Sequence, residues 1–236
     1  MVDVRPWPSV LVPSSEEWSL RGGTRSGGQT FQGNEQLVAS PTARWKASLT
    51  IPCVRREQVF AMRQVIALGR SAVWGPGPIE TNRAPWNVDF IGSKITYGQG
   101  AKNAAIDPAY EAGGDMSSAL VFSLADAAPR NAPLMTVQRD KGGVLEVGML
   151  MQFGDYRMHV ITGLPGGELA VPGKQGPPGR VLVEIRPWLR ADYAAGTRIE
   201  FGTPHCAMRL ASDDTAAMEL QLSKYGTVTL DLVEAF

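Results

Sequence analysis

The stretch Thr227-Val228-Thr229-Leu230-Asp231-Leu232 decides the fold class, because polar and apolar residues alternate along it without a break. Successive side chains of a β-strand point to opposite faces, so Val228, Leu230 and Leu232 share one face. We expect that face to be buried and the opposite face to meet solvent. Residues 206–210 and 218–222 alternate in the same way before this stretch. The C-terminal part of the chain therefore predicts an antiparallel meander.

A similar alternation occurs nearer the start of the chain, in residues 44–51. Pro52 is expected to end this strand, because proline has no backbone N–H to donate to a ladder. Residues 54–69 then carry apolar side chains at helical spacing, with arginines free to occupy the other side. This pattern predicts one amphipathic helix that ends near Gly69. The apolar positions are Val59, Met62, Val65 and Ile66.

Other segments show shorter strand-like patterns separated by turn residues. Gly154-Asp155 lies between two of them in a setting typical of a tight hairpin turn. Residues 99–118 show no clear period and are expected to be rich in loops. The 26 glycines and 17 prolines also favour turns over long helices. The strand-like segments are residues 86–98, 119–124, 144–153, 156–162, 181–185 and 197–201.

The charge balance argues against two classes of partner. The chain has 23 basic and 23 acidic residues, so no overall field favours direct nucleic-acid recognition. Its first eight residues include an acid and two prolines, unlike a signal peptide. No stretch approaches the roughly 18 consecutive apolar residues that a spanning helix needs, so membrane insertion is not expected.

The Gly-rich run of residues 21–28 is interpreted as an arm or a long contact loop. It does not end in the lysine and hydroxyl pair that completes a phosphate-binding loop, and no β-branched strand precedes it. We therefore expect this run to make contacts rather than to hold a nucleotide.

Residues able to carry chemistry are few and scattered. Cys53 and Cys206 are expected to be reduced and to serve as small apolar residues. His159 and His205 are interpreted as structural, and the neighbouring Cys206 would point away from His205 in a strand. Asp213-Asp214 has no third ligand nearby in sequence and is interpreted as a solvated turn.

The sequence thus predicts no catalytic, metal-binding or cofactor-binding residues, no cofactor and no enzymatic activity. A pair of distant carboxylates acting on a glycoside remains open, because no spacing singles one out. The tryptophans are expected to pack in the core or at an interface, with carbohydrate stacking as the alternative. They are Trp7, Trp18, Trp45, Trp74, Trp86 and Trp188.

Two parts of the chain resemble one known family. Residues 43–52 and the helix that follows look like the start of distal tail proteins, or related minor tail proteins, of long-tailed bacteriophages and gene transfer agents. The later part of the same family is similar to Gly154–Arg157, Val183–Arg190, Ala195–Phe201 and Met208–Asp214, in the same order. None of these segments is a catalytic motif.

The resemblance implies a structural virion protein of the phage tail tip or baseplate. Members of the family form a hexameric ring that joins the tail tube to the hub, so the implied partners are further copies, the tail tube protein and the hub protein. The tape measure protein is an additional candidate partner. The expected location is the tail tip of the virion, after synthesis in the host cytoplasm. The alternatives are a carbohydrate-binding or host-receptor-binding tail-tip module, a hub or a tail terminator.

The expected architecture is mainly β. We predict an antiparallel β-sandwich-like core with one amphipathic helix and a small inserted β-barrel. Residues 1–35 would form an N-terminal arm or loop, residues 36–135 and 205–236 the ring-forming core, and residues 136–204 the inserted barrel. Strand edges of such a core suit a ring, because they can pair with neighbouring copies.

Overall fold

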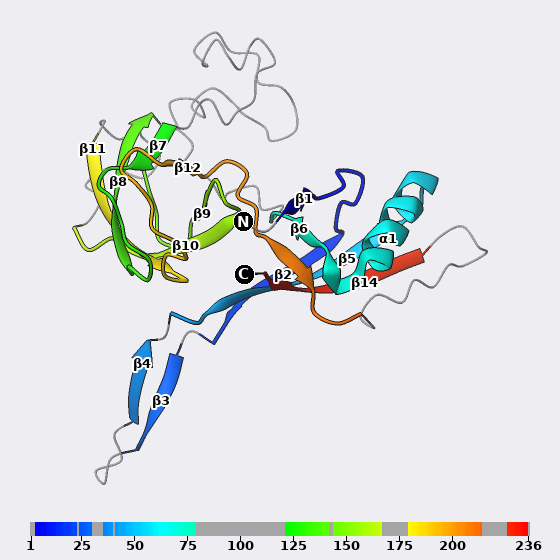
Figure 1. The fold of residues 1–236 in the computed structure, drawn as a ribbon, viewed down its shortest axis with the longest axis horizontal. Helices are drawn as coiled ribbons and strands as arrows, with labels where there is room; N and C mark the ends of the chain where they lie inside the picture. Colours follow the sequence, from blue (N-terminus) through cyan, green and yellow to red (C-terminus); the bar gives the residue numbers. More distant parts are fainter. Residues whose placement is uncertain are drawn as a thin grey trace. The chain divides into compact units, whose positions relative to one another are not determined.

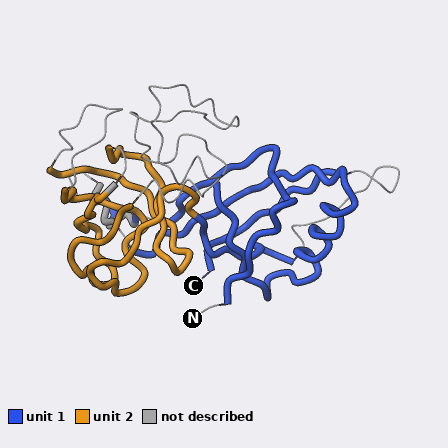
Figure 2. The backbone as a smooth tube through the Cα atoms, turned by 90° about the horizontal axis from the view of Figure 1, so that it is seen from above, with its two compact units in different colours: residues 1–79, 205–236 blue, residues 80–204 orange. Residues whose placement is uncertain are grey.

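The chain folds into two units (Figure 2), of which the second is an insertion into the first. Unit 1 comprises residues 1–79 and 205–236, and unit 2 comprises residues 80–204. In the described residues the fold is mainly β with one α-helix and a closed barrel, as the sequence predicted. The computed structural model describes residues 3–22, 24–29, 35–39, 41–78, 121–141, 144–166, 179–213 and 226–235.

Unit 1 is built on a six-stranded sheet in the order β1-β6-β13-β14-β5-β2 (Figure 1). Its first two strands in this order, β1 and β6, pair in parallel, whereas the other neighbours are antiparallel. β5 and β14 form its centre, and their register places Leu49 opposite Leu230. The strands are β1 (Val4–Pro6), β2 (Ser15–Arg21), β5 (Arg44–Cys53), β6 (Val73–Gly75), β13 (Met208–Leu210) and β14 (Gly226–Glu234).

The alternation that decided the fold class gives the sheet one buried and one solvated face. Val228, Leu230 and Leu232 are each at most 1% exposed, while Thr229 and Asp231 between them are exposed. On the solvated face Ser48 Oγ donates to Asp231 Oδ1 at 2.8 Å. Burying each such apolar side chain contributes about 1.5–3 kcal/mol, so this pattern fixes which face packs inward.

Helix α1 (Arg56–Leu68) packs against β5 with its buried residues Val59, Met62 and Val65, which confirms the predicted helix. At its start, Gln58 Oε1 accepts the backbone N–H groups of Val54 and Arg55, both at 3.0 Å. These bonds satisfy the backbone donors immediately before the first helical turn, as the side chain at this position does in a capping box. A short 3-10 turn, η1 (Gly69–Ser71), follows α1 directly.

Gly69 ends α1 with φ 53° and ψ −140°, a combination that is essentially restricted to glycine. A Cβ added there would lie 2.6 Å from Asp213 Oδ1, which accepts the Arg70 N–H at 2.8 Å. We therefore expect Gly69→Ala to lower the free energy of unfolding by about 2 kcal/mol in urea denaturation. Gly154→Ala is the matched control, because an added Cβ there meets nothing within 4 Å. Equal losses in the two variants would contradict this account of the helix end.

A separate two-stranded ribbon links β2 to β5. It consists of β3 (Thr24–Gln29) and β4 (Glu35–Ala39), which lie side by side in Figure 1. The pairing of β2 with β5 ends where Arg21 lies opposite Arg44. The pairing within the ribbon begins three residues later in the chain, where Thr24 lies opposite Ala39. Its register shifts between Ser26 and Gln29, at the two adjacent glycines.

Unit 2 contains a closed barrel of six strands in the order β10-β11-β8-β7-β12-β9. All of its neighbouring pairs are antiparallel. β9 and β10 form the hairpin predicted around Gly154-Asp155. The strands are β7 (Val121–Leu124), β8 (Leu134–Lys141), β9 (Leu150–Phe153), β10 (Arg157–Gly163), β11 (Gly179–Arg186) and β12 (Arg198–Glu200).

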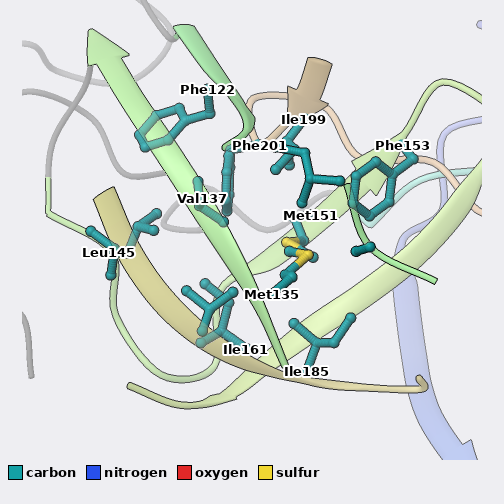
Figure 3. Close-up of a cluster of buried hydrophobic side chains, with 14 of the residues drawn as sticks. Phe122, Met135, Val137, Leu145, Met151, Phe153, Ile161, Ile185, Ile199 and Phe201 are labelled. Carbon is teal, nitrogen blue, oxygen red and sulfur yellow. The ribbon is translucent and has the colours of Figure 1, made fainter. Parts of the chain in front are cut away.

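The barrel interior is filled by apolar side chains from all six strands. Figure 3 shows Phe122, Phe201 and Ile199 on one side of this core and Ile161 and Ile185 on another. The rings of Phe122 and Phe201 are 4.8 Å apart between centroids. Small barrels have an interior just wide enough for side chains to fill, so this unit has its own core.

The structure moves the predicted start of the inserted barrel. Residue 136 falls inside β8, and β7 closes the barrel by pairing with both β8 and β12. The insertion therefore begins at residue 80 rather than at 136, whereas its predicted end at residue 204 agrees with the division into units. The sequence missed this boundary because closing a barrel requires pairing between strands far apart in the chain.

Three local predictions were also wrong. Residues 1–35 are not an arm or loop, because β2 is a strand of the sheet and most of the Gly-rich run lies in β3. Pro52 does not end its strand: β5 continues to Cys53, and Pro52 pairs with Thr227. The pairing of β5 with β2 ends at Thr50, so at Pro52 the strand β5 has a paired neighbour on one side only. A proline is tolerated there because its missing N–H is not needed on the unpaired side. The strand predicted over residues 144–153 occupies only Leu150–Phe153.

Several predicted segments lie outside the described residues. They are the strand-and-turn region 86–98, the loop-rich region 99–118 and the strand at residues 218–222. β13 pairs directly with β14, so the described part of the C-terminal meander is one antiparallel pair.

Candidate functional site

The β3–β4 ribbon is the first candidate surface. Within the described part of the chain it is a sheet of two strands, with no third strand paired to either side. A two-stranded ribbon alone is only marginally stable in water, because it buries little surface. Both of its backbone edges can accept another strand, which makes it suited to contact with a second chain.

The sheet of unit 1 adds two open edges. Among the described strands, β2 pairs only with β5 and β1 pairs only with β6. β1 has three residues and includes the exposed Pro6, which can donate no ladder hydrogen bond. β2 is longer, with seven residues, and carries the exposed Glu17 and the half-buried Glu16, whose Oε2 accepts the Trp18 indole N–H at 3.2 Å. The β2 edge is therefore the better acceptor for an added strand, and its acids limit which strand can pair there.

One end of the barrel brings together polar groups that the sequence did not connect. His159 lies inside the barrel, opposite Met151, and is fully buried. Its Nδ1 lies 2.8 Å from the carbonyl oxygen of Pro187, so Nδ1 carries the proton and Nε2 does not. The ring of His159 lies edge-on to Phe153 at 5.7 Å.

Tyr193 covers the same end of the barrel. Its ring stacks on Phe153 at 4.1 Å, and its hydroxyl donates to Asp155 Oδ2 at 2.7 Å. Burial and then the Asp155 carboxylate raise the pKa of the Tyr193 phenol, so it remains a protonated donor. Burial likewise lowers the pKa of His159 to about 4, against the Pro187 hydrogen bond and with help from Arg190 and Arg157.

The cysteines agree with their predicted state as reduced, small apolar residues. Cys53 and Cys206 are free, fully buried thiols, and burial raises the pKa of Cys53 above its usual value. His159 is buried, and His205 is half-buried beside Cys206. Cys206 Sγ lies 4.0 Å from the carbonyl oxygen of Ala207. A protonated, buried thiol is a poor nucleophile, and this agrees with the structural interpretation of Cys53.

Asp213 has a structural role at the end of α1 through its bond to Arg70, and Asp214 lies outside the described residues. In the described ranges, no three His, Cys, Asp or Glu side chains are grouped closely enough to hold a metal ion. Nor does any helix there combine the length and the apolar character that crossing a membrane requires.

The tryptophans are mostly packing residues. Trp45 and Trp74 are 6% and 2% exposed, so neither can stack on a sugar ring. Trp18 lies edge-on to Trp45, and Trp7 lies edge-on to Trp74. Trp188 is half-buried beneath the Arg186 guanidinium, and Trp86 lies outside the described residues.

Two buried charged residues were missed. Glu234 is 1% exposed and its Oε2 accepts the Trp45 backbone N–H at 3.1 Å, which ties β14 to the start of β5. Arg139 is 3% exposed in β8, and burial lowers the pKa of its guanidinium. Glu234 and Arg139 each lie two residues after a buried side chain, Leu232 and Val137 respectively. Side chains two residues apart in a strand share a face, so this alternation could have predicted their burial.

Comparisons with known proteins do not place the chain in a family. No protein-family model matches it, and no curated protein matches it.

Proposed function

We propose that this protein is a structural component of a phage tail tip, in which copies assemble into a ring through the β3–β4 ribbon and the open edge of β2. The observation that carries the proposal is the ribbon itself. A two-stranded sheet with both edges open gains stability when a neighbouring chain adds a strand.

The two surfaces differ in shape and sequence, so the contact is heterologous. The ribbon of one copy meets the β2 edge of the next, and repetition of such a contact gives a closed ring when the rotation between copies closes. The seven-residue β2 can pair along most of the length of a ribbon strand. Backbone pairing supplies affinity in such contacts, while the side chains at the edge select the partner.

The resemblance to distal tail proteins supports the same function. Its segments fall on strands of both units: residues 43–52 include most of β5, Val183–Arg190 includes the end of β11, Ala195–Phe201 contains β12 and Met208–Asp214 contains β13. They therefore belong to the framework of the fold. A structural protein is expected to resemble its family in this way, whereas an enzyme would share residues of an active site.

The test is the mass of the purified full chain, measured by light scattering after size exclusion, with negative-stain imaging of large species. We expect closed rings for the natural protein. Replacing residues 24–39 with a short Gly-Ser turn should give monomers whose far-UV circular dichroism is still that of a folded β protein, because the six-stranded sheet keeps all its strands.

Val147→Ser is the control, since Val147 is 59% exposed on unit 2 and lies far in sequence from the ribbon. Rings that persist after removal of the ribbon would contradict the assembly surface. A natural protein that stays monomeric even when mixed with the tail tube and hub proteins would contradict the tail-tip function.

A further inference from the structure

The outward side of α1 carries an aromatic side chain between two arginines. Residues spaced by three or four positions line up along a helix, so Arg56, Phe60 and Arg63 form one stripe. Ala67 continues this stripe one turn further on. All four residues are exposed, whereas the buried residues of α1 lie on the opposite side of the helix. We call the stripe of Arg56, Phe60, Arg63 and Ala67 the arginine face.

Phe60 leaves much of its ring in water. It is 50% exposed, and it is the only exposed aromatic residue in the ranges that the structure describes. The guanidinium carbon of Arg56 lies 5.0 Å from the centre of the Phe60 ring, so the two side chains form a cation–π contact. Aromatic and arginine side chains are enriched where proteins bind one another. The pair therefore has the composition of a docking surface.

The two arginines of this face have no carboxylate partner among the described residues. Neither Arg56 nor Arg63 forms an ion pair there, and Glu57 is the one acid within α1. Beyond the C-terminal end of α1, the Asp213 carboxylate accepts the Arg70 N–H at 2.8 Å, so the helix end has its own acid. The arginine face therefore keeps a positive charge that carboxylates of a partner can pair with.

The charge of the face selects the kind of partner. A second α1 would bring arginine against arginine, and such like-charge contacts are disfavoured. Nucleic acid presents a continuous row of phosphates, which two arginines beside Glu57 match poorly on a chain with 23 basic and 23 acidic residues. An acidic protein segment can supply separate carboxylates for Arg56 and Arg63 and an apolar side chain for Phe60. The acidic segment is therefore the best match.

We propose that the arginine face of α1 docks an acidic segment of another protein. Carboxylates of the segment pair with the guanidinium groups of Arg56 and Arg63, and an apolar side chain of the segment covers the Phe60 ring. Such a small, exposed contact is weak and is screened by salt. The face shares no residue with the β3–β4 ribbon or with β2, so this docking is separate from the assembly of copies proposed above.

The probe is a fluorescein-labelled synthetic peptide of about four helical turns, made of glutamate, leucine and alanine and added to the full chain at low salt. Fluorescence anisotropy should show binding that weakens by about tenfold when sodium chloride is raised to about 0.3 M. The double variant Arg56→Gln/Arg63→Gln should weaken binding by about tenfold, and Phe60→Ser by about threefold. Arg5→Gln/Arg130→Gln is the matched control, because it removes two exposed arginines that lie outside α1.

Reversal of the charge gives a second test of the same face. Arg56→Glu/Arg63→Glu should release the acidic peptide and bind a peptide in which lysine replaces glutamate, while its circular dichroism stays that of the natural protein. The proposal is overturned if the acidic peptide does not bind the natural chain at low salt, or if single-stranded DNA of similar charge binds more tightly. It is also overturned if the control variant loses as much affinity as Arg56→Gln/Arg63→Gln.

Discussion

Phe153→Ala is expected to lower the free energy of unfolding of the barrel by about 3–5 kcal/mol. Phe153 is fully buried, its ring stacks on Tyr193 and it lies edge-on to His159. Alanine would remove the ring and leave a cavity beside Tyr193 and His159. Most single domains are stable by only about 5–15 kcal/mol, so this loss is a large fraction of the free energy of unfolding.

Urea denaturation followed by circular dichroism measures the loss, with Val147→Ala as the matched control. Val147 belongs to the same unit but is 59% exposed, so its truncation should change stability by less than about 0.5 kcal/mol. A loss below about 1 kcal/mol for Phe153→Ala would show that the ring does not occupy the core as described.

His159 is expected to make the protein sensitive to acid. Burial lowers its pKa from the ordinary value of 6.5 to about 4, so the unfolded chain takes up the proton first as the pH falls. His159 does not destabilise the folded protein above pH 6.5. Its destabilising effect grows as the pH falls from 6.5 to about 4 and stays constant below that. Over this window the free energy of unfolding should fall by roughly 3 kcal/mol because of His159.

The measurement is the urea midpoint at pH 7 and near pH 4 for the natural protein and for His159→Asn, whose amide can still donate to Pro187. The variant should lose most of the acid sensitivity that the histidine causes. His205→Asn is the matched control, because His205 is the other histidine of the chain and is only half-buried. If His205→Asn removes as much of the pH dependence as His159→Asn, burial of His159 is not its cause.

Periodicity predicted the local structure well where one face of an element is buried. Residues 44–51 and 227–232 formed strands that pair with each other in β5 and β14, and residues 54–69 contained α1. In each case the alternation or the helical spacing of apolar residues indicated which side chains are buried. Prediction failed at Pro52, where a ladder on one side only tolerates a residue that a fully paired strand would exclude.

The candidate surfaces were less accessible to sequence reasoning. The Gly-rich run suggested a loop, because glycine disfavours strands, yet residues 24–29 pair with residues 35–39. The segment of residues 187–189 was visible only as part of a resemblance. Its attachment to the barrel depends on hydrogen bonds with His159, Ala132 and Asn131, which lie far away in the chain.

The sequence by itself determined that the described residues form a mainly β fold with one α-helix, that the cysteines are small apolar residues and that a hairpin turns at Gly154-Asp155. These features depend on residues close together in the chain, so local patterns carry them. The tertiary structure alone decided where the insertion begins, which edges stay open among the described strands and which charges meet at the end of the barrel. All three depend on contacts between residues far apart in the chain. β7 pairs with β12 to close the barrel, and the Tyr193 hydroxyl donates to Asp155 at one end of it.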